Sequence, residues 1–156
     1  MTMTIAEQGQ LICASASLVW DRLTQVNQWT QWYPGLKSAE LLETPKPGAI
    51  GRVAPLPGRP FHFTISQFDP EKLLVLRRPY KFGTELLQTY RLTRNAEGVV
   101  LTVETVCQGV LELQVGFLTR RKMNRELLDS VLGLKTFCEK MQAEEERRSV
   151  KLAQAS

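Results

Sequence analysis

The chain has 156 residues, of which 43% are hydrophobic and 23% are charged. A chain of this length and composition is expected to fold as one globular domain with a sizeable core, and disordered, collagen-like and membrane-spanning compositions are excluded. Basic residues outnumber acidic ones by only 20 to 16, and no predicted helix carries basic residues along one whole face. Nucleic acid is therefore not an expected partner.

The first residues and the cysteines both favour a cytoplasmic protein. Residues 1–10 contain neither the basic nor the apolar region of a secretory signal, and no stretch reaches the ~18 apolar residues of a spanning helix. Cys13, Cys107 and Cys138 are odd in number and far apart in the sequence. We therefore expect three buried, reduced thiols, with neither a disulfide nor a zinc site.

The first third of the chain predicts one extended segment followed by two short helical segments. Residues 4–13 are expected to be extended, and a serine in residues 14–17 can cap a short helix that ends near Leu23. Residues 26–35 carry two tryptophans three positions apart before a Pro-Gly turn signal. This segment is expected to form a second short helix or a tight loop.

The middle of the chain is typical of short strands and turns. All eight prolines fall between residues 34 and 79, and proline is confined to turns and to the edges of sheets. Apolar segments bounded by turn residues predict strands at 36–43, 49–54, 61–68 and 73–78. Clear alternation of apolar residues predicts two longer strands, at 85–93 and 99–107, joined by a hairpin turn at 95–98.

The last part of the sequence predicts one long amphipathic helix. At 100° per residue, the apolar residues from Met123 to Met141 fall within a stripe about 80° wide. A helix of about 25 residues spans roughly 38 Å, which is close to the width of about seven strands. We expect this helix to cross a curved sheet within a domain of residues 1–142. Residues 143–156 are expected to form a charged extension of the helix and then a frayed tail.

Several motifs add a resemblance to this pattern. They are Val19-Trp20, residues 29–35, 47–51 and 68–73, Tyr90-Arg91-Leu92, and Leu134-Lys135 with Glu139. With these motifs the chain resembles the helix-grip superfamily, which includes START lipid-binding domains and birch-pollen-allergen-like proteins, and it is most similar to bacterial polyketide cyclase/dehydrase-like (SRPBCC) proteins. The resemblance implies an α+β fold, in which an antiparallel sheet of six to seven strands wraps around the C-terminal helix. It also implies an apolar ligand, such as a lipid, a quinone or a polyketide, in a cavity between them.

The residues expected to line this cavity point inwards from the predicted strands, lie on the apolar stripe of the helix, or follow the second short helix. Among them, Gln88, Tyr90 and Thr105 are polar, and they either orient an oxygen of the ligand or satisfy neighbouring polar groups in the core. Of these, we expect Tyr90 to contact a ligand. The complete set is Trp32, Phe61, Phe63, Ile65, Leu86, Gln88, Tyr90, Leu101, Val103, Thr105, Met123, Leu127, Val131 and Leu134.

Three functions are compatible with this pattern. The first is a carrier or sensor that binds an apolar small molecule. The second is an enzyme of the aromatase/cyclase type, and the third is an interaction protein that resembles the chaperone activators of this fold. The lack of paired ionisable residues in the expected cavity favours binding. The only histidine, His62, alternates away from the apolar face, so no catalytic role is expected for it. No metal-ligand spacing and no phosphate-binding loop are present, so no cofactor is expected.

The start of the long helix is a candidate site for contact with an anionic membrane surface. There Phe117 precedes Arg120, Arg121 and Lys122, and cations at a helix N-terminus oppose the helix dipole. Anionic headgroups would compensate that placement. In the alternative, Phe117 and Leu118 complete the core, and the basic residues form an ordinary solvated turn.

Overall fold

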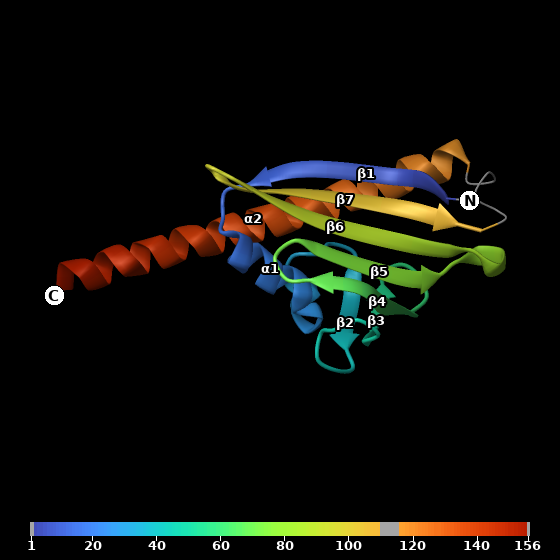
Figure 1. The fold of residues 1–156 in the computed structure, drawn as a ribbon, viewed down its shortest axis with the longest axis horizontal. Helices are drawn as coiled ribbons and strands as arrows, with labels where there is room; N and C mark the ends of the chain where they lie inside the picture. The colour runs from blue at the N-terminus through green and yellow to red at the C-terminus, as the bar shows by residue number, and fades with distance from the viewer. Residues whose placement is uncertain (1, 110–115, 156) are drawn as a thin grey trace.

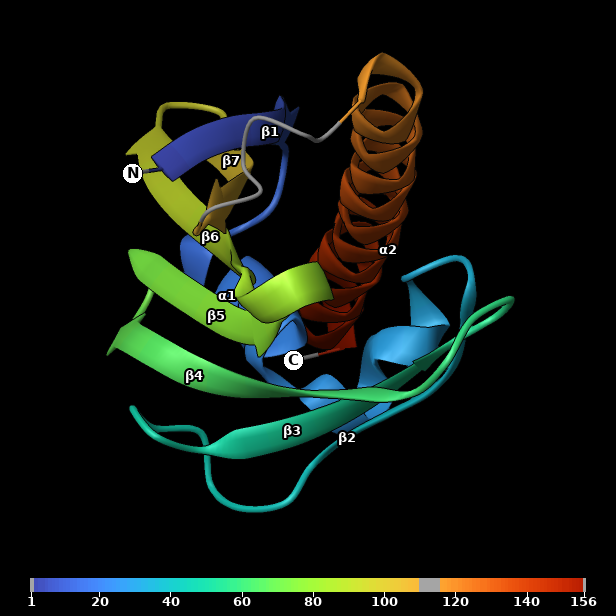
Figure 2. The same ribbon diagram turned by 90° about the vertical axis from the view of Figure 1, so that its right-hand side faces the viewer.

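The computed structural model describes residues 2–109 and 116–155. It contains a curved sheet and one long helix, α2 (Phe117–Ala155), that lies on the concave side of the sheet (Figures 1 and 2). The strands are β1 (Thr2–Ile12), β2 (Leu36–Leu41), β3 (Ile50–Pro55), β4 (Phe61–Asp69), β5 (Leu73–Pro79), β6 (Glu85–Asn95) and β7 (Gly98–Gln108). The short helices are α1 (Ala16–Thr24), η1 (Val26–Gln31) and η2 (Lys81–Gly83).

The seven strands form one antiparallel sheet in the order β1-β7-β6-β5-β4-β3-β2. Consecutive strands from β2 to β7 are neighbours, and β1 pairs with the last strand. Register shifts between Thr4 and Ala6 and between Ile65 and Gln67 interrupt the ladders, and such irregularities bend strands. This architecture confirms the α+β helix-grip fold. At the predicted hairpin, Asn95 Oδ1 accepts hydrogen bonds from the amides of Glu97 and Gly98.

The two short helices after β1 close one end of the concave side of the sheet. Ser15 caps α1, because its hydroxyl accepts a hydrogen bond of 3.1 Å from the Leu18 amide. Trp20 and Leu23 lie on the buried side of α1. The segment with two tryptophans forms the 3-10 helix η1. These features confirm the predicted pair of short helical segments.

The long helix α2 buries the predicted apolar stripe against the sheet. Leu127, Val131, Leu134 and Cys138 are buried, and the methionines at either end of the stripe pack against the same core. The helix then continues beyond the sheet to Ala155 (Figure 1), through residues 151–155, where the sequence predicted a frayed end. None of the helices in the described part of the chain has the length and apolar character needed to cross a bilayer.

One glycine allows α2 to lie directly against the segment that follows η1. A Cβ atom at Gly133 would collide with the carbonyl oxygen of Trp32 and would crowd the ring of Pro34. Any larger residue at position 133 must therefore push the helix away from this segment. The glycine costs about 1 kcal/mol of helix propensity, and in return the helix backbone reaches the backbone of residue 32.

The cysteines depart from the sequence-based expectation at one position. Cys107 and Cys138 are buried, but Cys13 is exposed, because it follows β1 at the turn into α1. The Cys13 amide donates a hydrogen bond of 2.8 Å to Glu139 Oε2, so the position has a structural role through its backbone. All three thiols are free. Burial raises the pKa of Cys138 to about 12. His62 is exposed, as predicted from the alternation along β4.

Candidate functional site

The residues predicted to line a cavity all lie between the sheet and α2. Strands β4, β6 and β7 turn their predicted residues to the concave face, and α2 adds its buried stripe. Most of them belong to one large apolar cluster. Leu86 belongs to a second, smaller cluster with Ile5 and Cys107, and Met123 packs against both clusters. Contact with a ligand remains a prediction for each of them.

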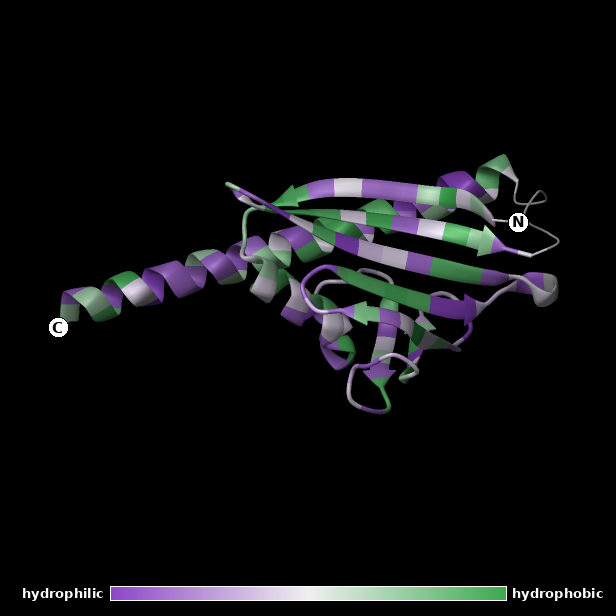
Figure 3. Cartoon of the chain, viewed as in Figure 1, coloured by the Kyte–Doolittle hydropathy of each residue, from purple (hydrophilic) through white to green (hydrophobic). Residues whose placement is uncertain are grey.

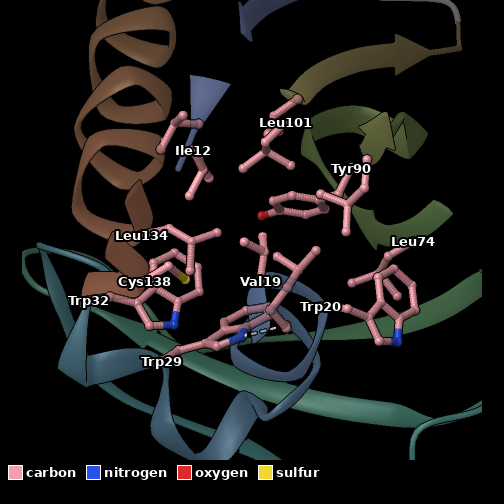
Figure 4. Close-up of a cluster of buried hydrophobic side chains, with 14 of the residues drawn as sticks. Ile12, Val19, Trp20, Trp29, Trp32, Leu74, Tyr90, Leu101, Leu134 and Cys138 are labelled. Carbon is pink, nitrogen blue, oxygen red and sulfur yellow. Dashed lines mark hydrogen bonds between the residues drawn. The ribbon is translucent and has the colours of Figure 1, made fainter. Parts of the chain in front are cut away.

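One part of this interior is filled by aromatic rings. We call Trp29 and Phe63 the aromatic core, and Trp32 lies at its edge, against Tyr33. The rings of Trp29 and Phe63 stack with centroids 5.7 Å apart, and those of Trp29 and Trp32 are 6.0 Å apart. The indole nitrogen of Trp29 donates a hydrogen bond of 2.9 Å to the Leu23 carbonyl. Figure 4 shows these tryptophans below the ring of Tyr90, on the side of the cluster nearest α1 and η1. This part of the interior is a closely packed core.

A second part of the interior is polar. We call Tyr33, Arg78, Gln88, Tyr90 and Ser130 the polar cluster. Gln88 Nε2 donates a hydrogen bond of 2.7 Å to the Tyr90 hydroxyl. The Ser130 hydroxyl donates a hydrogen bond of 2.8 Å to the Leu127 carbonyl. Ser130 and Arg78 lie near enough to Tyr33 to affect its pKa, and Tyr33 in turn affects the pKa of Tyr90. The cluster therefore brings together side chains from the segment after η1 and from β5, β6 and α2.

Arg78 reaches this cluster because it occupies one of the alternate positions of β5 whose side chains point to the concave face of the sheet. In the register between β5 and β6, Leu74 lies opposite Tyr90, Leu76 opposite Gln88, and Arg78 opposite Leu86. The Arg78 guanidinium carbon lies 4.1 Å from the centroid of the Phe61 ring and 5.9 Å from that of Tyr80. The arginine thus enters an apolar surface between two aromatic faces.

The Arg78 guanidinium has no carboxylate partner among the described residues. Burial lowers the pKa of Arg78, and the nearby groups Tyr33, Tyr80 and Glu126 oppose that effect. An arginine remains charged even then. Its neighbour Arg77 points outwards and lies 3.5 Å from Glu85. Two adjacent arginines therefore have opposite environments, one solvated and paired, the other half-buried and unpaired.

The tyrosines of the cluster are hydrogen-bond donors at neutral pH. Burial raises the pKa of Tyr33, against the opposing effect of Arg78. Burial also raises the pKa of Tyr90 well above its ordinary value, and Tyr33 adds to that effect. Both hydroxyls therefore keep their protons. The Tyr90 oxygen accepts from Gln88 and, among the described residues, donates to no acceptor, so its hydrogen is available to a ligand.

A further buried donor lies next to this cluster. The Trp32 ring centroid is 5.4 Å from that of Tyr33, and Trp32 is 6% exposed. Its indole nitrogen is buried without a hydrogen-bond partner, which is uncommon in native proteins. Together with Arg78 and Tyr90, it makes this part of the interior rich in donors and poor in acceptors. Such a site suits a ligand that carries carbonyl, carboxylate or enolate oxygen atoms.

A surface pocket of about 360 Å³ lies elsewhere on the molecule. None of the residues predicted to line a ligand cavity is among the described residues that line this pocket. Its walls carry hydroxyl and carboxylate groups with few large apolar side chains, so it does not match an apolar molecule. The lining residues are Ser15, Ser17, Leu18, Trp20, Asp21, Thr24, Pro70, Glu71 and Glu145.

The sequence-based prediction found Gln88 and Tyr90 but missed Tyr33, Arg78 and Ser130. Arg78 carried a usable signal, because it follows Leu74 and Leu76 at the even positions of an alternating strand. Ser130 also carried one, since it precedes Val131 on the stripe side of α2. Tyr33 follows η1 in an irregular segment, where no periodicity indicates the direction of a side chain.

The family to which the chain is related emerges from sequence comparison. The sequence model of the family described as polyketide cyclase / dehydrase and lipid transport matches residues 3–139. This match confirms the resemblance to polyketide cyclase/dehydrase-like proteins. None of the curated proteins compared with the chain matches it.

Solved structures with the same fold come from biosynthetic proteins of different kinds. DynU16, from the dynemicin biosynthetic locus, is 23% identical, with a TM-score of 0.70 over 88% of this chain and 48% of its own. The di-domain ARO/CYC StfQ of the steffimycin pathway is 14% identical, with a TM-score of 0.73 over 90% of this chain and 52% of its own. Norcoclaurine synthase of Thalictrum flavum is 15% identical, with a TM-score of 0.72 over 90% of this chain and 96% of its own.

The chain spans about half the length of the first two of these proteins. At identities below 25% the likeness to all three concerns the fold alone. The family match is a separate observation, and it covers most of the sequence, including the strands and the part of α2 that enclose the polar cluster. The chain therefore belongs to the polyketide cyclase/dehydrase and lipid transport family.

Proposed function

We propose that the protein binds an apolar small molecule that carries an anionic or easily enolised oxygen, between the concave face of the sheet and α2. The observation that carries this proposal is the unpaired guanidinium of Arg78 in the apolar interior. Arg78 is half-buried and forms no ion pair with a carboxylate among the described residues, so an anionic oxygen of a ligand can pair with it in surroundings less polar than water. The apolar side chains around the cluster would enclose the rest of the ligand.

The other polar groups support the same kind of ligand. The Tyr90 hydroxyl and the Trp32 indole each keep a hydrogen that no described residue accepts. Three donors directed at one oxygen-bearing group would orient the ligand, while the apolar walls discriminate weakly between molecules of similar size. A lipid acid, a quinone or a polyketide-like chain would each satisfy these requirements.

The test compares two ligands that differ only at the polar end, decanoate and 1-decanol. Quenching of tryptophan fluorescence reports binding, because Trp32 adjoins the cluster. We expect decanoate to bind roughly 10- to 100-fold more tightly, as hydrogen bonds to a charged group contribute about 1.5–3 kcal/mol. Arg78→Met should remove the preference and keep the binding of 1-decanol.

The matched control is Arg77→Met, which removes the same charge from the outer side of the same strand. We expect Arg77→Met to keep the preference for decanoate. Equal affinities of the unaltered protein for the two ligands, or equal effects of the two variants, would contradict the proposed role of Arg78. Failure of both ligands to saturate would contradict the binding function itself.

A second candidate is an enzyme that cyclises or dehydrates a polyketide-like chain, which is favoured by the family match and by the juxtaposition of Tyr33 and Arg78. A guanidinium stabilises the enolate that forms when a carbon next to a carbonyl loses its proton to a water molecule, and a protonated tyrosine can donate to the carbonyl oxygen. Solvent deuterium exchange at the α-carbon of a bound β-diketone tests this candidate. If the unaltered protein exchanges this position no faster than Arg78→Met does, the result would contradict the enzyme hypothesis.

A further inference from the structure

The outer side of α2 carries an unusual set of residues in its first turns. Phe117, Leu118, Arg121, Lys122 and Arg125 fall within an arc of about 140° at 100° per residue, and this arc lies opposite the buried stripe. All five are exposed. We call them the outer basic face.

The two apolar residues of this face are fully presented to solvent. Phe117 is 74% exposed and Leu118 is 77% exposed, so the expectation that they complete the core is wrong. Leu132, on the same side of the helix, is 39% exposed. Figure 3 shows apolar and polar residues side by side in these first turns of α2. Residues 111–115, which lie just before Phe117 in the sequence, are outside the described residues.

The membership of this face differs from the sequence-based prediction, because Arg120 is not part of it whereas Leu118 and Arg125 are. Arg120 lies on the side of the body of the protein, where its Nη2 donates to Met3 Sδ at 2.8 Å. Arg125, one turn after Arg121, is exposed on the outer side instead.

The charges at this end of the helix are all positive. Residues 117–125 contain four basic residues and no acidic one, although an anion is the favoured charge at a helix N-terminus. The first carboxylate, Glu126, lies 3.9 Å from Lys122 with both side chains more than 60% exposed, so this pair compensates little.

We propose that the outer basic face docks onto the surface of an anionic lipid bilayer. Large apolar residues beside lysine and arginine are the combination that binds the interface of a membrane, where the rings and methyl groups enter the headgroup region and the cations contact phosphates. Charge complementarity selects an anionic bilayer over a neutral one. The inference concerns the outer surface and does not depend on the proposed ligand.

The test measures co-sedimentation of the full chain with vesicles of equimolar phosphatidylglycerol and phosphatidylcholine. Each basic residue near such a surface contributes about 1 kcal/mol, so Arg121→Gln, Lys122→Gln and Arg125→Gln together should weaken partitioning on the order of 100-fold. Phe117→Ser with Leu118→Ser should also weaken it. Added salt should weaken the binding of the unaltered protein.

The matched control removes three positive charges from the other end of the same helix, by Arg147→Gln, Arg148→Gln and Lys151→Gln. We expect it to keep nearly all of the partitioning. Equal losses in the two triple variants, or equal binding to vesicles of pure phosphatidylcholine, would overturn the proposal.

The remaining alternative occupant is a second copy of the chain. Sedimentation equilibrium without vesicles separates the two. A dimer that dissociates in Phe117→Ser with Leu118→Ser would assign this face to self-association and would overturn membrane docking. All the substituted residues are exposed, so thermal unfolding should stay unchanged and show that each variant is folded.

Discussion

The aromatic core and the polar cluster occupy the same interior, yet they differ in how fully their polar atoms are satisfied. In the aromatic core, the Trp29 indole donates to the Leu23 carbonyl, and its ring stacks on Phe63. In the polar cluster, Arg78 lies over the rings of Phe61 and Tyr80 and forms no ion pair among the described residues, and the Tyr90 hydroxyl hydrogen has no acceptor among them. One region of the interior therefore stabilises the fold, whereas the other keeps polar groups without partners in the described part of the chain and is where we propose that a ligand binds.

The most severe test of this division is Trp29→Ala. Truncation should leave a cavity in the aromatic core and lower the free energy of unfolding by about 3–5 kcal/mol. Urea denaturation followed by circular dichroism measures the change. Trp29→Phe serves as the control, since it keeps a ring against Phe63 and should lose less. A loss below about 1 kcal/mol for Trp29→Ala would mean that this region is not closely packed.

The next test concerns the contact between α2 and the segment after η1. Gly133→Ala improves helix propensity by about 1 kcal/mol, but the added methyl group collides with the Trp32 carbonyl. We therefore expect a net loss of about 1–3 kcal/mol. Gly116→Ala is the control, because a Cβ atom there meets nothing within 4 Å. Stabilisation by Gly133→Ala in thermal unfolding would show that the helix can shift without cost.

In the polar cluster, we expect a substitution to raise the free energy of unfolding and not to lower it. Arg78→Met replaces an unpaired half-buried charge by an apolar side chain of similar length, and we expect the free energy of unfolding to rise by about 1 kcal/mol. Arg77→Met, on the solvated side of β5, should stay within about 0.5 kcal/mol of the unaltered protein. A clear loss of stability in Arg78→Met would indicate that the arginine supports the fold, and the distinction between the two regions would fail.

The smallest effect is expected at Glu139, at the surface above the packed end of the interior. Partial burial by itself raises the pKa of Glu139, but the hydrogen bonds from the Cys13 amide and Lys135 outweigh it, so the pKa is lowered. A folded-state pKa below the unfolded value of about 4.3 adds stability above that pH, and the contribution disappears as the pH falls through the folded-state pKa.

Glu139→Gln should therefore cost a few tenths of a kcal/mol at neutral pH, since partly exposed charges contribute little. The difference from the unaltered protein should vanish in acid, and denaturant unfolding at several pH values measures it. Glu145→Gln, at an exposed position further along α2, is the control. A difference that persists unchanged in acid would exclude a role for the ionised carboxylate.

The sequence predicted the fold because its strongest signals are periodic. Burial alternates strictly along β7 and less regularly along β6, and the stripe of α2 repeats along its buried side, so each element shows which face is inside. The order of the elements then matches the helix-grip fold. The exposure of Cys13 was mispredicted, since cysteine is usually buried and the turn after β1 has no periodicity to correct that expectation.

The site was less predictable, because its main residues break the usual rules of placement. A charged residue at a strand position is normally assigned to solvent, whereas the alternation along β5 places Arg78 on the inner face. The partners of Tyr33 depend on how η1 lies against α2. That contact is between segments about 100 residues apart in sequence, at Trp32 and Gly133, and no local pattern encodes it.

The length of α2 has a consequence for how the protein moves in solution. Its 39 residues extend about 58 Å at 1.5 Å per residue, whereas a compact chain of this size has a radius of gyration near 15 Å and hence a diameter of about 40 Å. The last turns therefore project about 20 Å past the body, as in Figure 1. Rotational diffusion should be anisotropic, and amides along α2, whose N–H bonds lie near the long axis, should relax as in a heavier molecule. Gel filtration should overestimate the mass for the same reason.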